Sequence, residues 1–145
     1  MTEEKAKAGQ PSQIPIWPNL FTYAADGAPR LICSRCRECR QTFYPQEAMC
    51  PACHQEGTLE RVEVDGRGRL ISFSRVTRGL PGYDSPYCLA CVELDEGPAL
   101  IAQLEEWRDQ ELKIGLPVSL VIGRIKVDPK GNTLLGPKFR VRGGQ

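Results

Sequence analysis

The sequence predicts a mainly β protein in which an N-terminal arm and a small cysteine-rich module precede a five-stranded barrel. Two observations support this fold class. Two Cys-x-x-Cys pairs lie close together, with ten residues between Cys39 of the first and Cys50 of the second. From residue 59 onward, short apolar segments of strand length alternate with turns rich in Gly, Pro and Asp. Several short strands separated by such turns are typical of β-barrels and β-sandwiches.

The two cysteine pairs predict a metal site. A gap of two residues lets one tight turn supply two thiolates, and four thiolates in a tetrahedron are a usual ligand set of structural zinc. We therefore expect Cys36, Cys39, Cys50 and Cys53 to bind Zn²⁺ in a rubredoxin-like zinc ribbon. Because four protein ligands leave the ion no open position, an independent zinc enzyme is the weakest of the functional hypotheses.

The other cysteines are interpreted as buried thiols. Cys33 extends the first pair to Cys33-x-x-Cys36-x-x-Cys39, similar to an iron–sulfur run, but a fourth cysteine lies much too far away. Cys88 and Cys91 stand three apart in an expected strand, so they point to opposite faces and cannot hold one ion. The odd total of seven cysteines favours a reducing compartment over a disulfide scaffold.

Composition disfavours other classes of protein. A formal net charge of +1 over 145 residues creates no strong field toward nucleic acid or an anionic membrane. No apolar run approaches the ~20 residues that cross a bilayer, and the N-terminus lacks the apolar core of a secretory signal. We therefore expect a cytoplasmic protein without membrane contact.

The N-terminal arm has two interpretations. Residues 1–13 are polar and are expected to be disordered. The apolar stretch 14–21 contains Pro15 and Pro18, which exclude a helix interior and a central strand. This stretch either packs on its own domain or docks on a partner through three apolar anchors, Trp17, Leu20 and Phe21.

The elements after the arm are expected in a simple order. A turn precedes a short strand at 30–33, the cysteine module runs to residue 57, and a strand follows at 59–64. Gly66-x-Gly68 lacks the third glycine and the helix of a dinucleotide fingerprint, so it is interpreted as a turn. The barrel strands are then expected at 70–76, 87–94, 99–104, 118–127 and 134–141.

Two details complete this prediction. The segment Glu105–Lys113 is the one credible helix, and Gly136-Pro137 makes the last strand an edge or bulged strand. Five strands with one small helix after the third match the OB-fold. The predicted division is a flexible N-terminus and docking arm (1–29), a zinc ribbon (30–62) and an OB-fold domain (63–145).

Polar residues suggest few further sites. His54, the one histidine, directly follows the last cysteine of the module and is interpreted as finishing that turn in a positive-φ conformation. Acidic residues concentrate in 93–111 and basic residues in 124–142. The basic block is either a solvated strand face or a rim that meets phosphates. A single-strand nucleic-acid binder is the alternative function, with three aromatic candidates for base stacking, Phe73, Tyr83 and Tyr87.

Several motifs together resemble one family. These are Cys36-x-x-Cys39, Phe43-Tyr44-Pro45, Cys50-Pro51-x-Cys53, the entry Gly66-Arg-Gly68-x-Leu-Ile-Ser-Phe-Ser, and four later stretches beginning at Pro86, Val92, Ile114 and Pro137. Over residues 30–142 the chain is similar to the acyl-CoA-associated zinc-ribbon/OB-fold family, the domain of unknown function thirty-five. Arg40 and His54 depart from the pattern, because that family often has glycine after the knuckle cysteines.

The resemblance implies a function. Members of this family are non-catalytic partner subunits of thiolases and related acyl-CoA enzymes, and some pair with hydratases or aldolases. This chain is most similar to the short versions that accompany degradative thiolases, for instance those acting on aromatic or steroid acyl-CoA thioesters. The resemblance implies a hetero-oligomer with a thiolase-like catalytic subunit, next to whose CoA or acyl channel this chain lies. Lys138 and Arg140 are the candidates for contacts with CoA phosphates.

Overall fold

The computed structural model describes residues 12–83, 86–108 and 112–142. Within these ranges the chain forms strands and no helix, and so it offers no helix long and apolar enough to cross a membrane. The strands are β1 (Gln13–Pro15), β2 (Phe21–Tyr23), β3 (Pro29–Cys36), β4 (Thr42–Phe43), β5 (Leu59–Val64), β6 (Arg67–Val76), β7 (Tyr87–Leu94), β8 (Ala99–Glu105), β9 (Pro117–Val127) and β10 (Thr133–Val141).

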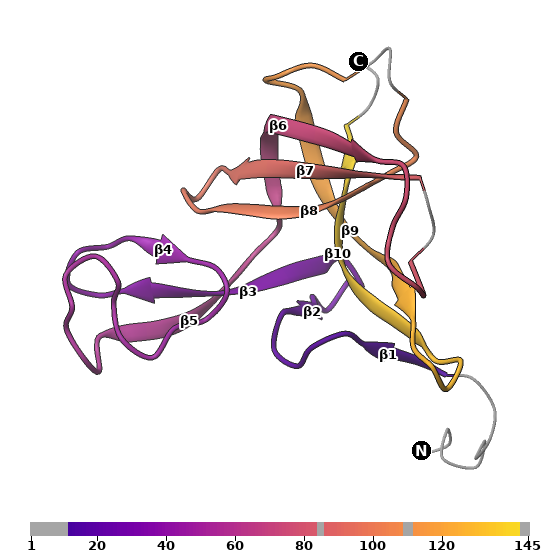
Figure 1. Ribbon diagram of the computed structural model, residues 1–145. Coiled ribbons are helices and arrows are strands. Elements are labelled where there is room, and N and C mark those ends of the chain that lie inside the picture. Colours follow the sequence, from indigo (N-terminus) through magenta and orange to yellow (C-terminus); the bar gives the residue numbers. More distant parts are fainter. Residues whose placement is uncertain (1–11, 84–85, 109–111, 143–145) are drawn as a thin grey trace.

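The five strands β6 to β10 close into a barrel (Figure 1). β6, β7 and β8 form an antiparallel meander, and β8 then pairs in parallel with β10 through Gln103–Glu105 and Lys138–Arg140. β10 and β9 are antiparallel, and the start of β6 pairs with β9 to complete the circle. This order is that of an OB-fold, so the predicted fold class is confirmed.

The alternation of side chains explains the barrel interior. Along β7 every second residue from Cys88 to Leu94 is buried, and the residues between them are half-buried. β6 enters the barrel after Gly66, whose φ is 77° and whose missing side chain leaves room for Leu120. Gly66 therefore has the turn role that the sequence indicates.

The predicted helix at Glu105–Lys113 is wrong for the residues that the structure describes. Glu105 is the last residue of β8, and Glu106 has φ 55°, which a right-handed helix excludes. Trp107 and Leu112 both pack against the barrel core. They stand five apart, whereas one helix face needs a spacing of three or four. Residues 109–111 lie outside the described ranges.

β10 is a bulged strand, as Gly136-Pro137 predicts. Its register against β9 shifts between Leu134 and Leu135. On its other edge, β1 pairs with residues 133–135 and β8 pairs with residues 138–140. Gly136 and Pro137 occupy the step between these two partners. The proline, which has no N–H to donate, therefore stands where that edge has no strand beside it.

The cysteine-rich module, called the ribbon below, consists of β3, β4 and β5. β3 pairs with β5 from Leu31–Val64 to Cys36–Leu59, with β4 at Ser34 and Arg35, and at its start with β2. The ribbon extends to one side of the barrel (Figure 1). Leu31 and Cys33 of β3 nevertheless belong to the same buried cluster as Leu70 and Phe139 of the barrel. One apolar core thus runs through both parts.

A cysteine cluster and an apolar groove as candidate sites

The structure brings the four predicted metal ligands together. The Sγ atoms of Cys36, Cys39, Cys50 and Cys53 all lie within 4.8 Å of one another. The Cys36–Cys53 and Cys39–Cys50 sulfur distances are 3.7 and 3.6 Å. With Zn–S bonds of about 2.3 Å, a tetrahedron has edges of about 3.8 Å. Both the donor set and its spacing therefore fit a four-thiolate metal ion.

The two halves of the cluster are nearly identical turns. The N–H of Cys39 points at the sulfur of Cys36 (3.5 Å), and the N–H of Cys53 points at the sulfur of Cys50 (3.4 Å). Each leading cysteine also donates its own N–H to the carbonyl five residues on. Arg40 and His54 close the turns with φ of 68° and 62°. The interpretation of His54 as the residue that finishes its turn is therefore confirmed.

One feature distinguishes the first turn. The hydroxyl of Thr58 lies 3.3 Å from the sulfur of Cys36, in buried surroundings. Thr58 is held there because its carbonyl accepts the N–H of Arg37, whose guanidinium in turn donates to the carbonyl of Gly57. The Cys39 N–H and the Thr58 hydroxyl lower the pKa of the Cys36 thiol to about 6. Cys36 is therefore readily available as a thiolate ligand.

The three remaining cysteines stand apart from the cluster. Cys33 and Cys88 are buried, as expected. Burial, together with the charge of Glu96, raises the pKa of the Cys33 thiol to about 11, so this thiol stays protonated. Cys91 lies on the opposite face of β7 from Cys88 and is only half-buried. The prediction of a second core thiol there is wrong, because Cys91 belongs to the outward set of the strand alternation.

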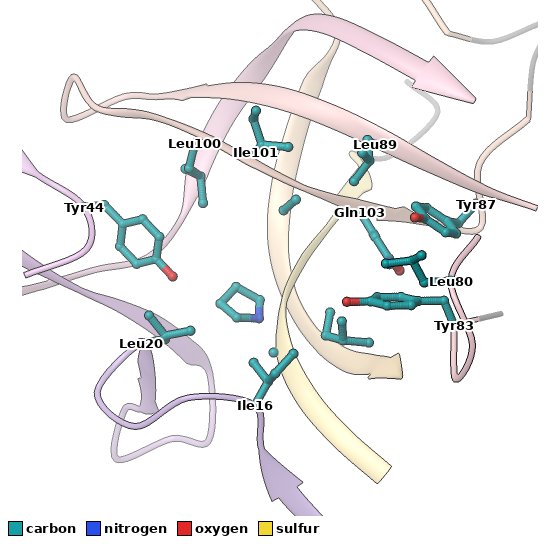
Figure 2. A pocket seen from close by; sticks show the side chains of 14 residues that line it. Ile16, Leu20, Tyr44, Leu80, Tyr83, Tyr87, Leu89, Leu100, Ile101 and Gln103 are labelled. Carbon is teal, nitrogen blue, oxygen red and sulfur yellow. The ribbon is translucent and has the colours of Figure 1, made fainter. Parts of the chain in front are cut away.

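An apolar groove lies where the arm, the ribbon and the barrel meet (Figure 2). Its volume is about 390 Å³. Ile16 and Leu20 of the arm form one wall, Tyr44 of the ribbon another, and Leu80 and Tyr83 of the β6–β7 loop a third. Strands β7, β8, β9 and β10 supply the rest. In OB-folds this face, beside the loop after the first barrel strand, is the usual place for ligands.

The arm packs on its own barrel, and its docking on a partner stays a prediction. β1 pairs with β10, and the Ile16 N–H donates to the Leu135 carbonyl at 2.7 Å, so the arm packs on its own barrel. Leu20 lines the groove, and Phe21 sits in β2 with its ring edge-on to Tyr23. Trp17, by contrast, is 66% exposed. Of the three predicted anchors, Trp17 alone has most of its surface free.

The acidic and basic blocks meet in space. Because β8 and β10 are parallel neighbours, Glu105 lies 3.5 Å from Lys138 and 3.3 Å from Arg140, and Glu106 also pairs with Arg140. The two residues predicted to contact CoA phosphates therefore already have carboxylate partners. Their contact with CoA stays a prediction.

The aromatic candidates for nucleic-acid stacking do not share one platform. Tyr83 and Tyr87 lie 5.9 Å apart inside the groove, and the Lys126 ammonium sits over the Tyr83 ring. Phe73 lines a separate depression on the barrel. The groove and Thr58 could not be found from sequence motifs. Thr58 meets Cys36 through the β3–β5 pairing, and the groove is assembled from distant segments.

Comparison with known proteins gives consistent matches. The family model described as "ChsH2, C-terminal OB-fold domain" matches residues 61–123. A DUF35 domain-containing scaffold protein from Pyrococcus furiosus is 35% identical over 77% of this chain and 82% of its own length. The benzoylsuccinyl-CoA thiolase subunit BbsA from Thauera aromatica is 35% identical over 85% of each chain. The solved Ltp2-ChsH2(DUF35) aldolase superposes with a TM-score of 0.65 at 31% identity, covering 79% of this chain and 86% of that one.

Proposed function

This chain belongs to the DUF35 family, and on that premise we propose that it is a non-catalytic, zinc-binding subunit of a thiolase-type acyl-CoA enzyme. The observation that carries the proposal is the match to thiolase subunit BbsA, which extends over 85% of both chains. A second BbsA, from Geobacter metallireducens, is 31% identical over 95% of this chain. A relative of nearly the same length is thus named as one subunit of a thiolase.

The solved Ltp2-ChsH2(DUF35) aldolase supports the same division of labour. Its name pairs a DUF35 chain with a second protein in one aldolase. By analogy, the catalytic residues belong to a larger thiolase-like partner, and this chain braces that partner in a hetero-oligomer. We propose that the chain also borders the CoA or acyl channel of the complex, with a degradative aromatic or steroid acyl-CoA as substrate.

Zinc has a structural role in this proposal. Cys36, Cys39, Cys50 and Cys53 would hold the ion, and their sulfur spacing suits it. A bound ion would cross-link the two turns. Zinc binding in small zinc modules contributes on the order of 10–16 kcal/mol of apparent binding free energy. That free energy would fix the ribbon, whose Tyr44 forms one wall of the groove.

Purification of the tagged full-length chain from its native source tests both the subunit role and the binding of zinc. Mass spectrometry of the bound material should find a thiolase-like chain in fixed ratio, and metal analysis should find one zinc per copy of this chain. A Cys50→Ala variant should lose the metal, whereas Cys91→Ala, which removes a thiol outside the cluster, should keep it.

Either half of the proposal can fail separately. A chain that elutes alone, and that does not change the activity of an added thiolase, would contradict the subunit role. Iron or no metal in the wild-type chain would contradict the assignment of zinc.

A further inference from the structure

The groove is lined entirely by uncharged residues. All fourteen are apolar, aromatic or, in the case of Gln103, an amide. The ammonium of Lys126 is directed onto the face of the Tyr83 ring, 5.0 Å from its centroid, and Lys126 is absent from the lining. Moving a carboxylate from water into such a place costs more than moving a neutral group, because the lining offers it no cationic side chain as a partner. The groove therefore selects against an ionised ligand.

Two phenol hydroxyls point into this space. Figure 2 shows the side chains of Tyr44 and Tyr83 on opposite sides of the groove, with their oxygen atoms directed between them. Among the described residues, no hydrogen bond joins either hydroxyl to another residue. Burial, with the nearby Cys33, raises the pKa of Tyr44 to about 12, so its hydroxyl remains a donor. A hydroxyl without a partner in an apolar wall contributes favourable binding free energy when it donates a hydrogen bond to a ligand oxygen.

Gly136 sets how closely the arm packs against the barrel beside the groove. At Gly136 an added Cβ would lie 3.0 Å from Ile125 and 3.1 Å from Ile16, so glycine lets the arm approach the barrel closely. The next residue, Pro137, lies in the step of β10 between the segments paired with β1 and β8. The volume of about 390 Å³ falls in the range of small-molecule sites, roughly 300–1,000 Å³.

From these observations we infer that the groove is a ligand site of this chain, and that it takes the neutral, largely apolar body of an acyl group bearing a ketone or hydroxyl oxygen. The ligand oxygen accepts a hydrogen bond from the hydroxyl of Tyr44 or Tyr83, and the apolar body lies against β8 and the arm. The inference deepens the proposed function, since it names the part of a thioester substrate that this subunit would hold. Acyl groups that end in a carboxylate are disfavoured.

A binding assay on the full-length chain alone tests the site. The neutral fluorescent probe N-phenylnaphthylamine should bind saturably and be displaced by decyl methyl ketone. Dodecanoate, of equal carbon number, should need at least about tenfold higher concentration. Leu80→Asp places a charge at a rim position that is 70% exposed and should weaken probe binding about tenfold or more. The matched control is Ile114→Asp, at a 62% exposed position outside the groove, which should bind the probe normally.

Hydroxyl removal separates the polar contact from the apolar one. The double variant Tyr44→Phe/Tyr83→Phe should leave probe affinity unchanged and weaken the ketone by about three- to tenfold. The inference is overturned if the probe does not saturate, if Leu80→Asp and Ile114→Asp behave alike, if dodecanoate competes as well as the ketone, or if the double variant leaves the ketone's affinity unchanged. Because the assay needs no partner, its failure is distinguishable from a failure to co-purify a thiolase.

Discussion

The hydroxyl of Thr58 lies 3.3 Å from the sulfur of Cys36, although 22 positions separate them in the chain. The antiparallel pairing of β3 and β5 creates this contact, since Cys36 pairs with Leu59, the neighbour of Thr58. Among the described residues, no side chain outside the cysteine cluster makes a comparable contact with Cys39, Cys50 or Cys53. The two nearly identical turns therefore differ in one outer hydrogen bond.

Thr58→Val should lower the affinity for zinc by about 10- to 100-fold, the usual effect of losing an outer hydrogen bond to a metal ligand. Thr58→Ser keeps the hydroxyl and should retain most of the affinity. Thr42→Val, in the same module but without a sulfur contact, is the control. Competition with a chromogenic chelator measures the affinities, and equal values for Thr58→Val and wild type would contradict the role of the hydroxyl.

Cys33 should make stability fall at alkaline pH. Burial, and secondarily the charge of Glu96, raises its pKa from the ordinary 9.0 to about 11, so the folded state favours the protonated thiol. This stabilisation is complete below pH 9 and is lost as the pH rises to 11. The expected loss is about 2–3 kcal/mol in the free energy of unfolding.

Urea titrations between pH 8 and 11 check this expectation. Cys33→Ala removes the titrating thiol and should flatten the decline between pH 9 and 10. A decline above pH 10 should survive in that variant, because Tyr44 also has a raised pKa, about 12. An unchanged decline below pH 10 in Cys33→Ala would assign the effect to another group.

Glu105→Gln should destabilise the barrel. The side chain of Lys138 is only 12% exposed, and its ammonium lies between the Glu105 carboxylate and the Arg124 carbonyl. Without the carboxylate, a largely buried cation loses its countercharge, which we expect to cost about 1–2 kcal/mol, between the values for surface and buried pairs. Glu106→Gln, at a side chain 74% exposed, should change stability by less than about 0.5 kcal/mol. Equal effects of the two variants in urea unfolding would refute this reasoning.

Trp17→Ala should weaken the complex with the thiolase-like partner without destabilising the chain. The indole is 66% exposed, so its truncation removes little packing within the subunit. Exposed aromatic anchors often account for 2 kcal/mol or more of binding free energy, equivalent to about 30-fold in Kd. Calorimetry on the reconstituted complex, with the similarly exposed Ile114→Ala as control, distinguishes an anchor from a passive surface residue.

Asn132→Ala should loosen the arm. The Asn132 side chain accepts the N–H of Ser12 at 3.1 Å and donates to Asp128, so it ties the β9–β10 turn to the start of β1. Losing one such hydrogen bond costs about 1 kcal/mol, so the Ile16 amide should exchange about fivefold faster with deuterium. Lys130→Ala, in the same turn, leaves these hydrogen bonds in place and should exchange at the wild-type rate. Equal exchange in both variants would show that other contacts hold the arm.

The sequence was sufficient for the strands and the cysteine cluster because both depend on local patterns. Alternation places Cys88 inside and Cys91 outside, and each Cys-x-x-Cys turn is complete within a few residues. The error at Cys91 came from assuming that an apolar strand is buried on both faces. The helix error came from reading propensity in a segment where tertiary packing of Trp107 and Leu112 decides the backbone.

What local patterns could not reveal arises from pairing between distant segments. The register of β8 against β10 brings Glu105 to Lys138, which turns two charge blocks into one set of ion pairs. The groove likewise forms only when Ile16, Tyr44 and Tyr83 line the same space, and no spacing in the sequence indicates that they do. Strand order in a closed barrel is a global property, so these sites follow only from the folded chain.

The pairing of Glu105 with Lys138 and Arg140 also bears on how fast a partner can bind. The electric fields of paired opposite charges largely cancel far from the protein surface. The whole chain also has a formal net charge of only +1. Such a surface exerts little long-range attraction on an approaching molecule. Encounter then proceeds by unassisted diffusion, with an association rate constant of about 10⁵–10⁶ M⁻¹s⁻¹ that changes little with ionic strength. Lasting assembly would accordingly depend on slow dissociation.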